Sequence, residues 1–169
     1  KIVTFVFTLK YRMIKKIAYI LFCFVGLYSC SSVKNVQDGQ LLLNSVTIKS
    51  DNKTVGIYEL EDYVRQQPNL SLPLFGKFRL GIYNMAGQDT SKWLNRSLQK
   101  IGQAPVIFSK NQTDITKTQF KKELQNKGYL NVEVDTVLSV KGKKLDLTYV
   151  IKSNTPYRVR NYEQEIEDA

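Results

Sequence analysis

Residues 114–152 constrain the fold most, because a helical pattern, a glycine and two alternating strand patterns follow one another there. Phe120 and Leu124 are four residues apart, so they share one face of a helix. Gly128 has no Cβ and can take the left-handed backbone conformation that ends a helix. With Tyr129 it forms a predicted structural stop, and the stretch predicts a helix followed by a β-hairpin.

Two runs of alternating apolar and polar residues follow this stop and meet at a lysine-rich turn, residues 141–144. Their apolar positions are Val132, Val134, Leu138, Val140, Leu145, Leu147, Tyr149 and Ile151. A period of two gives each strand one apolar and one polar face. The preceding helix can cover the apolar face, so the stretch predicts an α+β fold. Thr116 and Gln119 have the spacing of a capping box and predict that this helix begins near Thr116.

Residues 1–29 have the composition of a secretory signal peptide. They hold five basic residues and no acidic residue, and a short apolar run follows Lys15 and Lys16. That run is too short to span a bilayer, which favours a signal peptide over a membrane helix. The chain begins with Lys1, so we expect Met13 to be the true start. Without this segment the net charge falls from +10 to +5, because twenty basic and fifteen acidic residues remain.

Cys30 follows the apolar run and ends the sequence Leu27-Tyr28-Ser29-Cys30, which resembles the lipobox of bacterial lipoproteins. The cysteine of a lipobox is acylated and becomes the first residue of the mature chain. Cys23 would leave with the signal peptide, so the exported chain would form no internal disulfide. The resemblance implies lipidation of Cys30, including palmitate, and anchoring to a membrane. The alternative is a free or buried cysteine.

The first part of the mature chain predicts a strand and a helix. Residues 41–48 are mostly apolar and precede a polar turn at residues 50–53. Leu60 and Val64 have helical spacing, and Pro68 would end that helix. Acidic residues near its beginning complement the helix dipole. They are Glu59, Glu61 and Asp62.

Residues 69–90 are rich in apolar side chains but follow neither the helical nor the strand period throughout. Gly76 and Gly81 have the glycine spacing of a P-loop, but the lysine and hydroxyl residue that a P-loop requires are missing. The segment either packs on the core or forms a contact surface for a partner or for lipid headgroups. Another helix is predicted at residues 91–101, with Trp93 packed beside its apolar face.

The chain lacks the residues that most catalytic and metal sites need. It has no histidine, no zinc-binding pattern and no nucleophile elbow. Its lysines gather on the predicted helix and turn as Lys121, Lys122, Lys127, Lys141, Lys143 and Lys144. They are not interleaved with stacking aromatic residues, so they indicate solvated faces. We expect no enzyme activity, cofactor, metal, nucleotide or nucleic-acid partner. An enzyme with a carboxylate pair among Glu59, Glu61 and Asp62 is one alternative.

Residues 124–134, with the sequence LQNKGYLNVEV, resemble the helix-to-strand segment of POTRA (polypeptide-transport-associated) domains. Four further segments extend the resemblance: residues 38–44, 65–69, 102–107 and 156–160. As a set they resemble the amino-terminal part of TamL-like lipoproteins of the BamA/TamA superfamily. The resemblance spans residues 30–168 and is specific as a set rather than motif by motif.

This resemblance implies an α+β fold of the POTRA type, with element order β-α-α-β-β. Its small mixed sheet would be covered on one face by helices. Residues 41–152 would form the domain, with a partly helical insertion at about residues 67–112. Residues 30–40 would be the lipidated tether, and residues 153–169 would begin a second, truncated POTRA unit.

In that family POTRA repeats precede a membrane β-barrel, for which this chain is too short. The resemblance implies a module of an outer-membrane protein assembly or translocation factor, lipid-anchored at the outer membrane and facing the periplasm or the cell surface. Client or partner polypeptides would pair with a sheet edge by β-augmentation. That edge maps to residues 131–140, with Asn131, Val132, Glu133, Val134 and Asp135 as candidate contacts. The alternative is an unrelated surface lipoprotein, such as an adhesin or a glycan-binding module.

Overall fold

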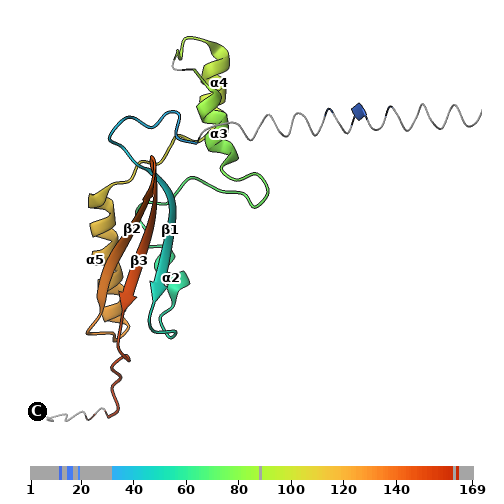
Figure 1. Cartoon of the computed structure of the whole chain (residues 1–169). Helices are drawn as coiled ribbons and strands as arrows, with labels where there is room; N and C mark the ends of the chain where they lie inside the picture. Colours follow the sequence, from blue (N-terminus) through green and yellow to red (C-terminus); the bar gives the residue numbers. More distant parts are fainter. Residues whose placement is uncertain are drawn as a thin grey trace, which may run out of the picture.

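The computed structural model describes residues 32–87, 89–161 and 163, together with Arg12, Lys15, Lys16 and Tyr19. Figure 1 labels the helices and strands. They are β1 (Leu42–Ser50), α2 (Ile57–Glu61), α3 (Phe78–Met85), α4 (Trp93–Ile101), α5 (Lys110–Asn126), β2 (Glu133–Lys141) and β3 (Lys144–Lys152). The described residues therefore form the predicted α+β fold, with four helices and one three-stranded sheet.

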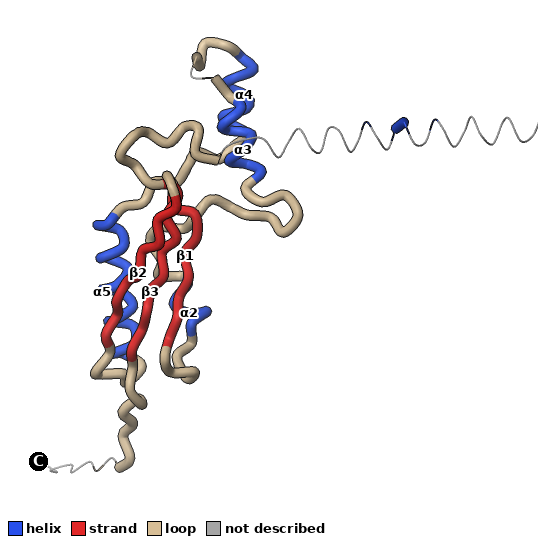
Figure 2. The backbone as a smooth tube through the Cα atoms, viewed as in Figure 1, coloured by secondary structure: helices blue, strands red, loops and turns tan. Residues whose placement is uncertain are grey.

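β3 lies at the centre of the sheet, whose strand order is β1-β3-β2. It pairs in parallel with β1 and antiparallel with β2, so the sheet is mixed as predicted. Apart from α3 and α4, the elements follow one another as β-α-α-β-β. α3 and α4 fall within residues 67–112, where the sequence predicted a partly helical insertion. Figure 2 shows these two helices beyond one end of the sheet.

The main core lies between one face of the sheet and the helices α2 and α5. Alternate residues of β3, from Leu145 to Ile151, are buried there, as its predicted alternation requires. α5 contributes Phe120 and Leu124, which confirms that these two residues share a buried face. The rings of Phe120 and Tyr149 meet edge to face, with centroids 5.2 Å apart, a favourable arrangement for aromatic pairs.

α5 begins earlier than the capping box at Thr116 predicted. Ser109 is its N-cap residue, and the Ser109 hydroxyl accepts a hydrogen bond from the backbone N–H of Gln112. Ser109 and Gln112 have the same spacing as the predicted pair, so the sequence contained two possible starts. Thr116 is instead buried inside the helix, where its hydroxyl donates to the Gln112 carbonyl and accepts from the Arg65 N–H.

α2 ends at Glu61, whereas the sequence predicted a helix that continues to Pro68. The reason lies at Arg65, whose backbone N–H donates to the hydroxyl of Thr116 in α5 at 3.1 Å. In a continuous helix that N–H would instead bond to the carbonyl four residues earlier. The contact with α5 therefore holds this segment outside the helix.

α3 forms in the segment where the sequence showed no continuous period. It pairs with α4 as an antiparallel α3–α4 hairpin, because Arg79 at the start of α3 donates to the Ile101 carbonyl at the end of α4. Gly102 follows α4 as the predicted stop, but its backbone is extended rather than left-handed. A Cβ on Gly102 would lie 2.6 Å from the Tyr83 backbone nitrogen, so glycine is needed for close helix contact.

The predicted packing of Trp93 is wrong, because its side chain is 75% exposed. No residue of α4 is buried, and Leu94 and Ile101 are also exposed. The reason is the orientation of α4, which directs Asn95 and Gln99 toward the Gly87 backbone at the end of α3. Its apolar residues therefore do not contribute to the core.

Candidate functional site

β2 forms an outer edge of the sheet, because it pairs with β3 on one side only. In the part of the chain that the structure describes, no other backbone hydrogen bond reaches residues 133–141. An unpaired strand edge presents free N–H and C=O groups along its length. The sequence placed the candidate edge at residues 131–140, and the strand Glu133–Lys141 lies there.

The five residues predicted to contact a partner alternate between two environments. Val132 and Val134 are buried in the core, so they hold this segment against the helices. Asn131, Glu133 and Asp135 are exposed. A partner strand at this segment would therefore meet the backbone edge and three polar side chains, while the two valines would stay in the core.

The second half of β2 differs from the first, because its apolar side chains are exposed. Leu138 and Val140 have the parity of Val134 but are 48% and 52% exposed, so the prediction that this face is covered along the whole strand is wrong. α5 runs in the opposite direction to β2, so its beginning lies at this end of the strand (Figure 1). The buried residues there are Thr113 and Thr116, which reach less far over the sheet than phenylalanine or leucine would.

Val137 is a residue of this edge that sequence reasoning missed. It lies on the opposite face of β2 from Leu138 and is 56% exposed. Its position between Asp135 and Ser139, on the polar parity of the strand, was a sequence signal for an exposed apolar side chain. The second half of β2 therefore offers apolar contacts on both faces as well as a free backbone edge.

β1, at the other edge, is covered over its first half. The Leu43 N–H donates to the Val106 carbonyl at 2.8 Å, which places residues 106–108 along this edge. The pairing with β3 is irregular at Asn44, whose carbonyl accepts a 2.6 Å hydrogen bond from the Lys77 ammonium group. A bulge and a lysine are both common ways to block further strand pairing. The two edges are thus unequal.

The stop at Gly128 and Tyr129 determines where β2 begins. Gly128 has a φ of +93°, which confirms the predicted left-handed conformation. Its N–H donates to the Gln125 carbonyl at 2.9 Å, and the Tyr129 N–H donates to the Leu124 carbonyl at 2.9 Å. This pair of bonds is a Schellman motif, and the buried Tyr129 and Leu124 supply its apolar contact. The Tyr129 hydroxyl also lies 2.9 Å from the Thr54 hydroxyl.

The segment after β3 returns to this stop. The Tyr157 N–H donates to the Gly128 carbonyl at 2.9 Å. A Cβ on Gly128 would lie 2.6 Å from the Tyr157 carbonyl oxygen, so both the backbone angle and the contact require glycine. Among the described residues of the run 156–160, none belongs to a strand, and Tyr157 and Val159 are exposed.

The carboxylates considered for catalysis have structural contacts instead. Glu59 forms a hydrogen-bonded ion pair with Lys127, which links the start of α2 to the end of α5. Hydrogen bonding to Glu59 raises the pKa of Lys127, opposed in part by burial. Asp62 caps the end of α2. Within the described residues no group of histidine, cysteine or acidic side chains could hold a metal ion.

The basic residues singled out in the sequence fall at two ends of the sheet. Lys121, Lys122 and Lys127 lie at the end of α5, where the chain turns into β2. The lysines of residues 141–144 lie at the β2–β3 turn, at the opposite end (Figure 1). The structure therefore does not bring the six lysines together into one surface.

Cys30 and nearly all of the predicted signal peptide lie outside the described residues. Among the helices that are described, none combines the length and apolar character needed to cross a bilayer. No protein-family model matches the chain, and comparisons with curated proteins and with solved structures also give no match.

Proposed function

We propose that this chain is a lipid-anchored module of an outer-membrane protein assembly or translocation factor, and that it binds extended polypeptides along β2. The observation that carries the proposal is the free outer edge of β2, with apolar side chains exposed on both faces of its second half. An added strand would pair with the free backbone groups and cover these side chains. The resemblance of residues 124–134 to POTRA domains supports the same function.

The side chains of β2 suggest what kind of polypeptide would fit. In β-augmentation the backbone gives affinity, and side chains at alternate positions give specificity. Leu138 and Val140 would contact one face of the added strand, and Val137 would contact the other. A client with apolar residues near this end and polar residues near Glu133 and Asp135 would complement the strand. Segments of about ten residues with alternating hydrophobicity, typical of outer-membrane strands, are the natural candidates.

The proposal is tested with fluorescently labelled peptides of this alternating type, whose binding is followed by fluorescence anisotropy. Two versions of one peptide carry N-methyl groups on alternate residues, one on each edge of the extended chain. Because a β2 partner donates from one edge only, one version should lose binding and the other should keep it. Equal binding of the two versions would rule out pairing with a strand edge.

Variants of β2 locate the binding site. Replacing both Leu138 and Val140 with lysine should weaken peptide binding at least about tenfold, because the buried apolar contact is lost. Val159→Lys is a matched control, since Val159 is exposed and lies outside the sheet. Circular dichroism checks that both variants are folded. Full affinity in the β2 variant would place the peptide elsewhere.

The lipid anchor is a separate part of the proposal and depends on Cys30. Labelling with a palmitate analogue in a bacterial host should mark the wild-type chain but not the Cys30→Ala variant. The labelled chain should also fractionate with the outer membrane. Labelling that is unchanged in Cys30→Ala would reject acylation at this residue without affecting the peptide-binding result.

A further inference from the structure

The α3–α4 hairpin and the loop before it expose many large apolar side chains. Examples within residues 70–101 are Leu74, Phe75, Phe78, Met85, Trp93 and Ile101. Exposed apolar residues that stand alone are ordinary, but a group of them in one segment usually marks a contact surface. The sequence left open whether this segment packs on the core or meets a partner or lipid, and the exposure of these side chains favours contact.

The same segment is basic. Its charged residues are Lys77, Arg79, Lys92, Arg96, Lys100 and Asp89, which give residues 70–101 a net charge of +4. The β2–β3 turn adds the exposed Lys141 and Lys144 near the base of the hairpin. Burial, followed by the charge of Lys144, lowers the pKa of Lys77, as expected where the turn and the hairpin are close. This end of the molecule therefore combines apolar and positive groups.

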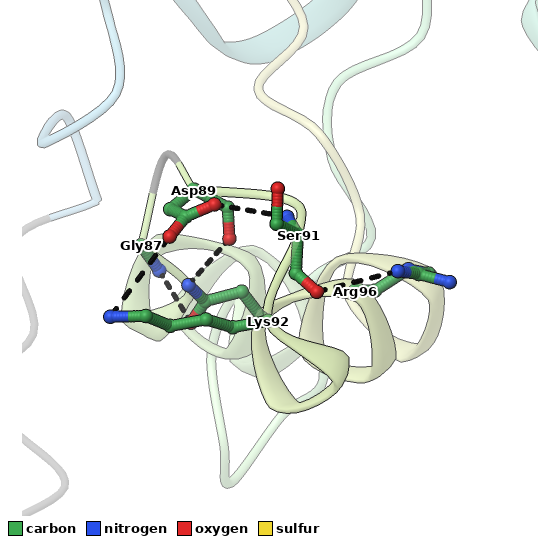
Figure 3. A network of polar contacts seen from close by, with 6 residues as sticks. Gly87, Asp89, Ser91, Lys92 and Arg96 are labelled. Atoms are coloured by element: carbon green, nitrogen blue, oxygen red, sulfur yellow. Dashed lines mark hydrogen bonds and ion pairs between the residues drawn. The ribbon is translucent and has the colours of Figure 1, made fainter.

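Polar contacts hold α4 with its apolar residues free. The Gly87 N–H donates to the Asn95 side-chain oxygen at 3.1 Å, and the Asn95 side-chain nitrogen donates to the Asp89 carbonyl at 2.8 Å. Figure 3 shows this network, in which the Ser91 N–H donates to the Asp89 carboxylate at 3.0 Å. The polar side of α4 is thus used for contact with the end of α3. Trp93, Leu94 and Ile101 are left exposed by the described residues.

The composition of this surface distinguishes a bilayer from a protein partner. Tryptophan, phenylalanine and leucine beside lysine and arginine are typical of helices that lie in the headgroup region of a membrane. Lysine, in contrast, is depleted in protein–protein interfaces. Position agrees with composition: Val33 and Val36 pack with Leu80 of α3, so a lipid attached just upstream would hold the hairpin near the bilayer.

We propose that the α3–α4 hairpin binds directly to the surface of a bilayer that contains anionic lipids. Trp93, Leu94 and Ile101 enter the boundary between headgroups and acyl chains, while Lys92 and Lys100 contact lipid phosphates. This contact goes beyond the peptide-binding function and does not require acylation of Cys30. If Cys30 does carry a lipid, the hairpin adds a second contact that orients β2 relative to the membrane.

Trp93 provides a local probe, because it is the only tryptophan in the chain. The full chain with Cys30→Ala, which cannot be acylated at that position, is mixed with vesicles of phosphatidylcholine and phosphatidylglycerol in equal parts. We expect a blue shift of the tryptophan emission and quenching by brominated acyl chains. Vesicles of phosphatidylcholine alone should give a much smaller change at the same lipid concentration. Equal changes with both vesicles, or none with either, would overturn the proposal.

Charge reversal separates the hairpin from the other basic end of the molecule. Lys92→Glu combined with Lys100→Glu should weaken vesicle binding at least about 25-fold, since each basic residue near an anionic surface contributes about fivefold. Lys121→Glu combined with Lys122→Glu changes the charge equally at the far end of α5 and should leave the Trp93 signal unchanged.

The remaining occupants of this surface give different results. An emission shift that depends on protein concentration without vesicles, together with dimers in analytical ultracentrifugation, would identify a second copy of the chain instead. An equal loss of vesicle binding in both charge variants would show that only the overall charge matters and would also overturn the proposal. The peptide assay on β2 is independent of all these outcomes.

Discussion

The sheet with α5 and the α3–α4 hairpin use apolar residues in opposite ways. In the sheet, Leu145, Leu147 and Ile151 are buried against Phe120 and α2, so their apolar area stabilises the fold. In the hairpin, Trp93 and its neighbours remain exposed, and polar contacts set the position of α4. Stability and surface properties are therefore separated in this molecule, and substitutions in the two regions should have very different effects.

The largest effect is expected in the sheet. Leu147→Ala removes a fully buried side chain from the central strand. It should lower the free energy of unfolding by about 2–5 kcal/mol, because apolar burial is lost and a cavity is left. Urea denaturation followed by circular dichroism measures this change. A loss below about 1 kcal/mol would mean that the sheet is not the stabilising region.

The helix stop should give the next largest effect. Gly128→Ala should cost about 2 kcal/mol, since alanine disfavours the left-handed conformation and its Cβ would meet the Tyr157 carbonyl. Gly142→Ala is a matched control: Gly142 also has a positive φ, of +60°, but nothing lies within 4 Å of an added Cβ. Its cost should be only about 1 kcal/mol. Equal costs in urea denaturation would remove the contribution of the Tyr157 contact.

A smaller, pH-dependent effect is expected on the polar face of the sheet. Hydrogen bonds from Ser45 and Asn44, at 2.5 and 2.6 Å, lower the pKa of Asp146 in the folded protein. A lowered pKa gives stability above the ordinary aspartate value of about 3.9, which is lost as pH falls through the folded value. Asp146→Asn should therefore cost about 1 kcal/mol at neutral pH.

Thermal unfolding from pH 7 to pH 2 checks this expectation. The difference between the wild type and Asp146→Asn should shrink as the pH falls below about 4, because the carboxylate is then protonated. A difference that stays constant over this range would show that the charge of Asp146 contributes nothing.

The smallest effect on stability is expected in the hairpin. Trp93→Ala should change the free energy of unfolding by less than about 0.5 kcal/mol, since the side chain is exposed and has no core contacts to lose. The same variant should still weaken vesicle binding. A stability loss comparable to that of Leu147→Ala, measured by urea denaturation, would break the contrast between the two regions.

Features fixed by neighbouring residues could be predicted from the sequence. The spacing of Phe120 and Leu124, the glycine at position 128 and the alternation along β3 are local signals, and the structure confirms each of them. The start of α5 was not decided locally, because Ser109 and Thr116 both have a glutamine three residues later. The Arg65 N–H bonds to the Thr116 hydroxyl from a distant part of the chain, and no local pattern contains that contact.

The candidate site was predicted in position but not in detail. The resemblance of residues 124–134 placed an edge strand after Gly128, and β2 lies at the edge. The exposure of Leu138 and Val140 was missed, because it depends on how far the side chains of α5 reach over the sheet. The protection of β1 was also missed, since Lys77 is 33 residues from Asn44 in the sequence.

The parallel pairing of β1 with β3 has a mechanical consequence. β1 begins at the end of the sheet near α3, and β3 ends at the opposite end, from which the carboxyl-terminal segment leaves (Figure 1). A tension that pulls these two ends apart acts along the strands. The backbone bonds between β1 and β3 lie across that direction and share the load, rather than breaking one after another from one end. A chain held at a membrane on one side and pulled on the other would thus meet the sheet in its most resistant direction.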